Sequence, residues 1–130
     1  MEKEVKITII DDDRDLVEFV KTYLQRRGFL VSFAYSGGEG LEVVRKERPQ
    51  LIILDIMMPE MDGSQVLREL KKDSTLKDIP VIMLTAKDRQ IDRTSFLELG
   101  AYEYIAKPLD MDMLLRQVRN VLEKKEKGEL

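Results

Sequence analysis

The 130-residue chain contains neither cysteine nor histidine. Without cysteine, disulfides, thiolate nucleophiles and zinc–thiolate sites are excluded. Without histidine, a Ser-His-Asp triad, imidazole metal ligands and a phosphohistidine carrier are excluded as well. Any chemistry must therefore use carboxylates, hydroxyls, lysine or arginine, together with a metal ion taken from solution.

The sequence also lacks long apolar runs and an excess of positive charge. No run approaches the roughly 18 apolar residues of a membrane-spanning helix, and residues 1–4, Met-Glu-Lys-Glu, are charged where a secretion signal would begin. We therefore expect a cytoplasmic protein without membrane contact. The formal net charge of -3 does not favour nucleic acid as a direct partner of this chain.

Short apolar runs alternate with amphipathic stretches along the chain. This alternation predicts an α/β fold, a doubly wound five-stranded parallel sheet with five helices on its two faces. The strands are predicted at residues 5–10, 30–35, 51–54, 80–84 and 102–105. Helices are predicted at residues 14–27, after the N-cap Ser36, after the loop 56–63, within 89–99 and from about Met111. Asp62, which precedes Gly63, is expected to form a turn and to cap the third of these helices.

The length of the chain suits a single domain with one core. We assign residues 1–123 to this domain. Residues 124–130 are charged and are expected to form a frayed helix end, a tail or the stub of a linker.

Carboxylates follow two of the predicted strands at the point where each strand ends. Asp11, Asp12 and Asp13 follow the run 5–10, and Asp55 follows the run 51–54. In open parallel sheets, ligands bind outside the carboxyl ends of the strands. Crowded carboxylates repel one another and need a cation, and an oxygen-only site suits Mg²⁺. We expect Asp13 either to serve the helix N-terminus or to support the site from outside the metal ligands, and not to bind the metal directly.

Two further polar groups are predicted at the same edge of the sheet. Thr85 follows the fourth run, and Lys107 follows the fifth run and precedes Pro108. Their hydroxyl and ammonium groups complete the parts that phosphoryl transfer requires, which are mainly positioning and electrostatic stabilisation.

These elements, taken in order, resemble the receiver domain of bacterial two-component response regulators, including the stand-alone chemotaxis type. The resemblance covers essentially the whole chain and implies a flavodoxin-like sheet with strand order 2-1-3-4-5. It is carried by five segments: Ile-Ile-Asp-Asp-Asp (9–13), Leu-Asp-Ile-Met-Met-Pro-Glu-Met-Asp-Gly (54–63), Met-Leu-Thr-Ala (83–86), Leu-Gly-Ala (99–101) and Tyr-Ile-Ala-Lys-Pro (104–108).

The resemblance implies a role for each site residue. Asp55 would be the phosphoacceptor, which attacks a phosphoryl group to form an acyl phosphate. Mg²⁺ would be bound by Asp12, Asp55 and the carbonyl of Met57, with Asp11 acting through a water molecule. The remaining roles concern the phosphoryl oxygens: Lys107 would pair with Asp55 and then with one of them, while the Thr85 hydroxyl and the Ala86 backbone NH would bind others.

The resemblance also implies a conformational switch. Thr85 would move toward the phosphate, and the ring of Tyr104 would turn inward, which alters the face formed by the fourth helix, fifth strand and fifth helix. The Lys107–Pro108 bond would be cis. Met57 has no carboxylate or amide to orient an attacking water, and Lys87 is the second position expected to set how long the phosphate survives. Because of Met57 we expect slow autodephosphorylation.

The implied partners are a sensor histidine kinase or a histidine phosphotransfer protein, and a downstream target or output domain. The donor would dock near the first helix and the loop after the fifth strand, where the candidate contacts are Glu18, Lys21, Thr22 and Gln25. A phosphorylation-dependent dimer is possible on the same grounds. The chain would not be an enzyme acting on external substrates, because its only chemistry would be on itself.

Three other functions are compatible with parts of the sequence. Asp11-Asp12-Asp13 satisfies the Asp-x-Asp motif of haloacid-dehalogenase-like phosphatases, although Asp15 stands where those enzymes have Thr or Val. The same fold can serve as a phosphate-independent interaction module, which loss of Asp55, Thr85 or Lys107 would indicate, but all three are present. A DNA-binding regulator would need a further output domain beyond this sequence.

Overall fold

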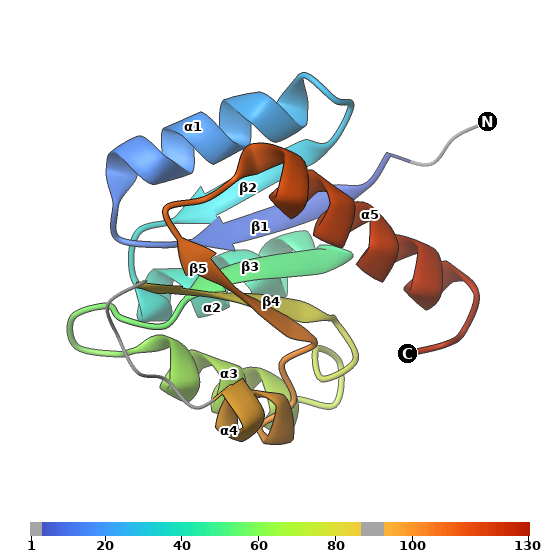
Figure 1. Ribbon diagram of the computed structural model, residues 1–130. Coiled ribbons are helices and arrows are strands. Elements are labelled where there is room, and N and C mark those ends of the chain that lie inside the picture. The colour runs from blue at the N-terminus through green and yellow to red at the C-terminus, as the bar shows by residue number, and fades with distance from the viewer. Residues whose placement is uncertain (1–3, 87–92) are drawn as a thin grey trace.

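The computed structural model describes residues 4–86 and 93–130 and contains a five-stranded parallel sheet in the order β2-β1-β3-β4-β5 (Figure 1). The strands are β1 (Lys6–Ile10), β2 (Leu30–Ala34), β3 (Leu51–Asp55), β4 (Val81–Ala86) and β5 (Glu103–Lys107). The helices are α1 (Arg14–Gln25), α2 (Gly37–Glu47), α3 (Gly63–Lys72), α4 (Arg93–Glu98) and α5 (Met111–Glu126). The predicted fold class and strand order are confirmed.

Helices cover both faces of the sheet and create two cores (Figure 1). On one face, which we call the α1/α5 core, strand residues such as Ile9 and Ile53 pack against α1 and α5. On the other face, the α2/α3 core, Ile10 and Leu54 pack against α2 and α3. Successive residues of a strand point to opposite faces, so strands buried on both sides form continuous apolar runs.

Polar side chains cap the N-termini of helices at the predicted positions. The Asp13 carboxylate accepts a hydrogen bond from the backbone N–H of Leu16 at the start of α1 (3.1 Å), and the Ser36 hydroxyl caps α2. Asp62 caps α3 and forms a reciprocal capping box with Gln65. The predicted role of Asp13 at the N-terminus of α1 is therefore confirmed.

Several element boundaries differ from the predicted ones. Helix α1 ends at Gln25, before the predicted end at residue 27. Its fully buried residues are Val17, Val20 and Leu24, and the half-buried Leu16 and Tyr23 pack against the same core. Strand β4 continues to Ala86, and β5 begins at Glu103 and continues to Lys107. The extensions arise from parallel pairing of Thr85 with Ala106 and of Ala86 with Lys107.

The C-terminal helix extends into the charged segment 124–130, for which a helix end was one of the predicted forms. Helix α5 continues to Glu126, so the first part of the predicted tail is helical. The Lys125 ammonium donates a hydrogen bond to the carbonyl of Asp78 at 2.7 Å, which ties this last turn to the segment before β4. For the predicted fourth helix, the structure describes Arg93–Glu98, and the helix ends before Gly100, whose φ is +109°. Lys87 lies outside the described residues.

Within residues 4–86 and 93–130, no helix combines the length and the apolar character that crossing a bilayer requires.

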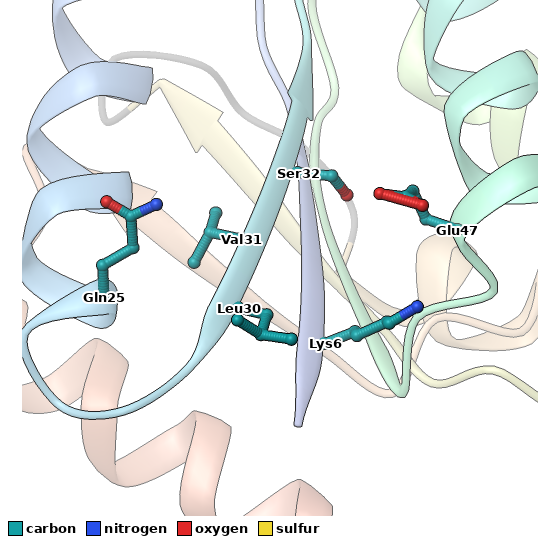
Figure 2. Close-up of a pocket in the computed structure, with 6 residues that line it drawn as sticks. All are labelled: Lys6, Gln25, Leu30, Val31, Ser32 and Glu47. Atoms are coloured by element: carbon teal, nitrogen blue, oxygen red, sulfur yellow. The ribbon is translucent and has the colours of Figure 1, made fainter. Parts of the chain in front are cut away.

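A pocket of about 260 Å³ lies at the edge strand β2, near the amino ends of β1 and β2. Figure 2 shows that Gln25 and Val31 lie on one side of the strand, and Ser32 and Glu47 on the other. The Ser32 hydroxyl is hydrogen bonded to that of Thr8 at 2.7 Å. Because the predicted site residues follow the opposite, carboxyl ends of the strands, this pocket is separate from them.

Candidate metal centre

The carboxyl ends of the strands bring the predicted acidic residues together. Asp11 directly follows β1, and Asp55 is the last residue of β3, which pairs with β1 on one side and with β4 on the other. Carboxylate oxygens of Asp11, Asp12 and Asp55 all lie within 4.8 Å of one another. Asp11 and Asp55 are buried, whereas Asp12 is exposed. The three carboxylates therefore form one cluster that is open to solvent on the side of Asp12.

Lys107 reaches this cluster from the end of β5. Its Nζ lies 2.9 Å from Asp11 Oδ2 and 3.4 Å from Asp55 Oδ1. The resemblance implied a pair with Asp55, and the structure adds the shorter contact with Asp11. The Lys107–Pro108 peptide bond is cis, as the resemblance implied.

Burial and mutual repulsion set the protonation of the two buried carboxylates. Burial, together with the charge of Asp11, raises the pKa of Asp55 to about 7, against the opposing effects of Lys107 and of a hydrogen bond from the Met57 backbone N–H. Burial likewise raises the pKa of Asp11, although the N–H of Asp13 (2.9 Å) and Lys107 oppose the shift. Two carboxylates that share one ammonium are therefore short of positive charge.

The neighbouring carboxylates outweigh burial in setting the pKa of Lys107. Burial alone would lower the pKa of Lys107, but its hydrogen bond and charge interaction with Asp11, together with the charge of Asp55, raise the pKa overall. Lys107 is therefore a fixed positive charge at the centre of the site.

The donor groups fit a hard divalent cation. Asp11 Oδ2 is buried, and its polar contact among the described residues is the Lys107 ammonium, 2.9 Å away. Three carboxylates with oxygen donors and few protein ligands are typical of Mg²⁺ sites. The site would be completed by the carbonyl of Met57, whose amide contacts Asp55.

Thr85 and Tyr104 lie on neighbouring strands and on the same face of the sheet. Tyr104 pairs with Met83, and both contribute to the α2/α3 core, while Thr85 lies two residues beyond Met83. The buried Thr85 hydroxyl donates to the carbonyl of Ala86 at 3.5 Å, a weak contact. The hydroxyl is therefore directed along its own strand and held only loosely.

Gly63 supports the site, and the sequence reasoning did not identify it. A Cβ atom at this position would lie 2.3 Å from the Asp55 carbonyl oxygen and 2.8 Å from Ile56 Cα. The Gly63 N–H donates to the Ile56 carbonyl at 2.8 Å. The start of α3 can therefore approach the backbone of Asp55 only because residue 63 has no side chain. The Asp-Gly pair at 62–63 was the available signal, but it was interpreted as a turn and a cap.

A family model described as the response regulator receiver domain matches residues 7–119. The chain therefore belongs to the response regulator receiver domain family of two-component signalling, and the resemblance to this family is confirmed. The match accounts for most of the chain, including the site residues described above.

Individual relatives agree with this assignment. The chain is 42% identical over 128 residues to the probable transcriptional regulator ycf27 of Porphyridium aerugineum. This alignment covers 98% of this chain and 52% of the relative. It is 39% identical over 118 residues to response regulator MprA of Mycobacterium ulcerans, and this alignment covers 91% of this chain and 50% of the relative. The chain thus spans about half the length of these curated relatives.

A solved structure shows the same fold over the whole domain. The CheY-like receiver domain protein of Methanospirillum hungatei has a TM-score of 0.89 and 31% identity, and the alignment covers 97% of this chain and 99% of the other.

Proposed function

We propose that this receiver domain is a phosphorylation switch in which Asp55 accepts a phosphoryl group in a Mg²⁺-dependent reaction. The observation that carries the proposal is the buried pair of carboxylates, Asp11 and Asp55, joined by one Lys107 ammonium. Such a pair is costly to bury. Phosphoryl transfer, however, needs these three groups close together: a carboxylate nucleophile, an acid that holds a metal ion and a cation that binds the phosphoryl oxygens.

The reaction would be the transfer of a phosphoryl group to an Asp55 carboxylate oxygen. A bond forms between that oxygen and phosphorus, while the bond from phosphorus to the donor nitrogen or oxygen breaks and the donor keeps the electron pair. Lys107 and the Met57 N–H favour the ionised carboxylate that must attack. Mg²⁺ held by Asp11, Asp12, Asp55 and the Met57 carbonyl would supply positive charge that offsets repulsion between nucleophile and phosphoryl group.

Groups of the chain would then bind the transferred phosphoryl oxygens. Lys107, already 3.4 Å from Asp55, can pair with one oxygen without moving to a new region of the protein. The Thr85 hydroxyl can exchange its weak contact with Ala86 for another oxygen, and the Ala86 N–H can serve a third.

The switch would follow from the move of Thr85. Tyr104 is half-buried on the next strand and on the same face, so it can turn toward space that Thr85 leaves. This would change the surface formed by α4, β5 and α5, where Leu97 of α4 and Met113 of α5 already expose apolar side chains. A surface that changes its packing with phosphorylation can select a downstream target, an output domain or a second copy of the chain.

The phosphoryl donor would be a histidine kinase or a phosphotransfer protein that docks on α1 and the loop after β5. Phe19 supports this position because this large apolar residue of α1 is 61% exposed. Of the predicted contact residues, Glu18 and Gln25 are exposed, whereas Lys21 and Thr22 are half-buried. The Lys21 ammonium lies 5.0 Å from the centre of the Phe33 ring, so Lys21 also serves the packing of α1 on β2.

An output domain is supported by the greater length of the curated relatives, about twice that of this chain. We further propose that the protein works in the cytoplasm and acts only on itself, with slow autodephosphorylation because the Met57 side chain cannot orient a water molecule.

The test is intact mass measurement after incubation with acetyl phosphate, with and without Mg²⁺. The wild type is expected to gain one phosphoryl group only with Mg²⁺, and Asp55→Ala is expected to gain none. Asp62→Ala is the matched control, because Asp62 lies in the neighbouring loop and caps α3. A wild type that gains nothing, or an Asp55→Ala protein that is still modified, would refute the proposal.

A further inference from the structure

Met57 differs from most other methionines of the chain in its exposure. The sequence contains seven methionines. Met57 is 43% exposed and Met113 is 41% exposed, while the other methionines in the described part of the chain are buried or half-buried. A methionine sulfur that solvent reaches can be oxidised to the sulfoxide, whereas a buried one is protected.

Met57 is also the exposed methionine that touches the site. Its backbone N–H donates a hydrogen bond to the Asp55 carboxylate. The flanking residues Ile56 and Met58 are buried, so the backbone on either side of Met57 is anchored in the core. The flexible, unbranched side chain therefore starts from a fixed point beside the nucleophile. Met113 lies in α5 and is not part of the acidic cluster, so it is a natural comparison.

We propose that Met57 is a redox modification site, through which a peroxide shortens the lifetime of the phosphoryl group on Asp55. This inference rests on the proposed function of Asp55. In the modification step, hydrogen peroxide transfers one oxygen atom to the Met57 sulfur. The sulfur is oxidised by two electrons, the O–O bond breaks, and peroxide is reduced to water.

The sulfoxide changes what the side chain can do next to the phosphoryl group. A thioether sulfur is a weak hydrogen-bond acceptor, whereas the sulfoxide oxygen is a polar acceptor that can hold a water molecule. Attack of this water on phosphorus forms a P–O bond and breaks the bond to the Asp55 oxygen. The products are inorganic phosphate and the free carboxylate, and the proton of the water passes to solvent. A single hydrogen bond of ordinary strength to the attacking water corresponds to about fivefold in rate.

The experiment compares the wild type with Met57→Leu and Met113→Leu, each before and after treatment with hydrogen peroxide. Leucine preserves apolar volume and cannot be oxidised. Peptide mapping by mass spectrometry first establishes which methionines carry oxygen. Decay of the phosphoryl group is then followed after the acetyl phosphate has been removed. The response to peroxide is measured for each variant against its own untreated form, because Met57 contributes backbone groups to the site.

Oxidation is expected to accelerate decay about fivefold in the wild type and in Met113→Leu, and to leave Met57→Leu unchanged. Methionine sulfoxide reductase should restore the slow decay. Met57→Gln, which carries a permanent polar acceptor, should decay faster without any peroxide.

Three results would overturn the inference. One is peroxide treatment that oxidises Met113 but not Met57. Another is a Met57 sulfoxide with unchanged decay. The third is an equal response in Met57→Leu. Failure of the proposed function is distinguished at the outset, because it would appear as untreated protein that takes up no phosphoryl group at all.

Discussion

Asp55→Asn should stabilise the metal-free protein at alkaline pH, although it removes the proposed nucleophile. Asp55 is 4% exposed, and one of its carboxylate oxygens lies within 4.8 Å of oxygens of Asp11 and Asp12. Asparagine has nearly the same shape and carries no charge, and it leaves the 2.9 Å contact between Lys107 and Asp11 in place. The substitution therefore tests how much free energy the charge of Asp55 costs the fold.

The raised pKa of Asp55 sets the magnitude. The pKa rises from 3.8 to about 7 in the folded protein, which corresponds to a difference of about 4 kcal/mol between the charged and the neutral form. Because the folded state binds this proton more tightly, the associated stability is fully present below the unfolded pKa and is lost as pH rises through the folded pKa. The buried amide keeps part of the desolvation cost, so we expect a gain of roughly 2–4 kcal/mol at about pH 8.

Urea denaturation with a chelator present measures this difference. The free energy of unfolding of Asp55→Asn should exceed that of the wild type at about pH 8, and the difference should shrink toward zero near pH 4. Adding Mg²⁺ should stabilise the wild type more than the variant, because the variant lacks one metal ligand. Asp12→Asn is the control. Because Asp12 is exposed, this variant should gain less free energy of unfolding than Asp55→Asn. An Asp55→Asn protein that is no more stable than the wild type at about pH 8 would refute the reasoning.

Three further outcomes follow from the same contacts. Lys107→Met leaves Asp11 and Asp55 buried without their cation, so it should lower the free energy of unfolding by about 3 kcal/mol near neutral pH. Adding Mg²⁺ should restore the lost stability, and an unchanged midpoint of urea denaturation would contradict the prediction. Asp62→Ala removes the α3 capping box and should cost about 1 kcal/mol. Because its hydrogen bond with Ser64 lowers the pKa of Asp62, this cost should disappear in acid, as pH falls through the folded pKa. Gly63→Ala forces a Cβ atom against Asp55 and should cost about 1–3 kcal/mol, whereas Gly38→Ala, with nothing within 4 Å, should not destabilise; equal thermal midpoints for the two would show that the contact relaxes freely.

Local patterns in the sequence determined the fold. Runs buried on both faces predicted parallel strands, and the caps Ser36 and Asp62 predicted where helices begin, because these signals depend on residues within one turn of each other. The predicted strands at residues 80–84 and 102–105 end too early, because β4 continues to Ala86 and β5 to Lys107. Thr85 and Lys107 are polar, and they belong to strands only because Thr85 pairs with Ala106 and Lys107 with Ala86. Such pairing joins distant segments and leaves no trace in the local pattern.

The sequence by itself also determined which residue types meet at the site, since the ends of adjacent parallel strands share one edge of the sheet. Only the tertiary structure decided how they interact. It placed the Lys107 ammonium closer to Asp11 than to Asp55, it raised the pKa of Asp55 through burial, and it brought the start of α3 against the Asp55 backbone at Gly63. Ion-pair distances and desolvation depend on how all five strands and their covering helices pack together, so no spacing within a single segment could predict them.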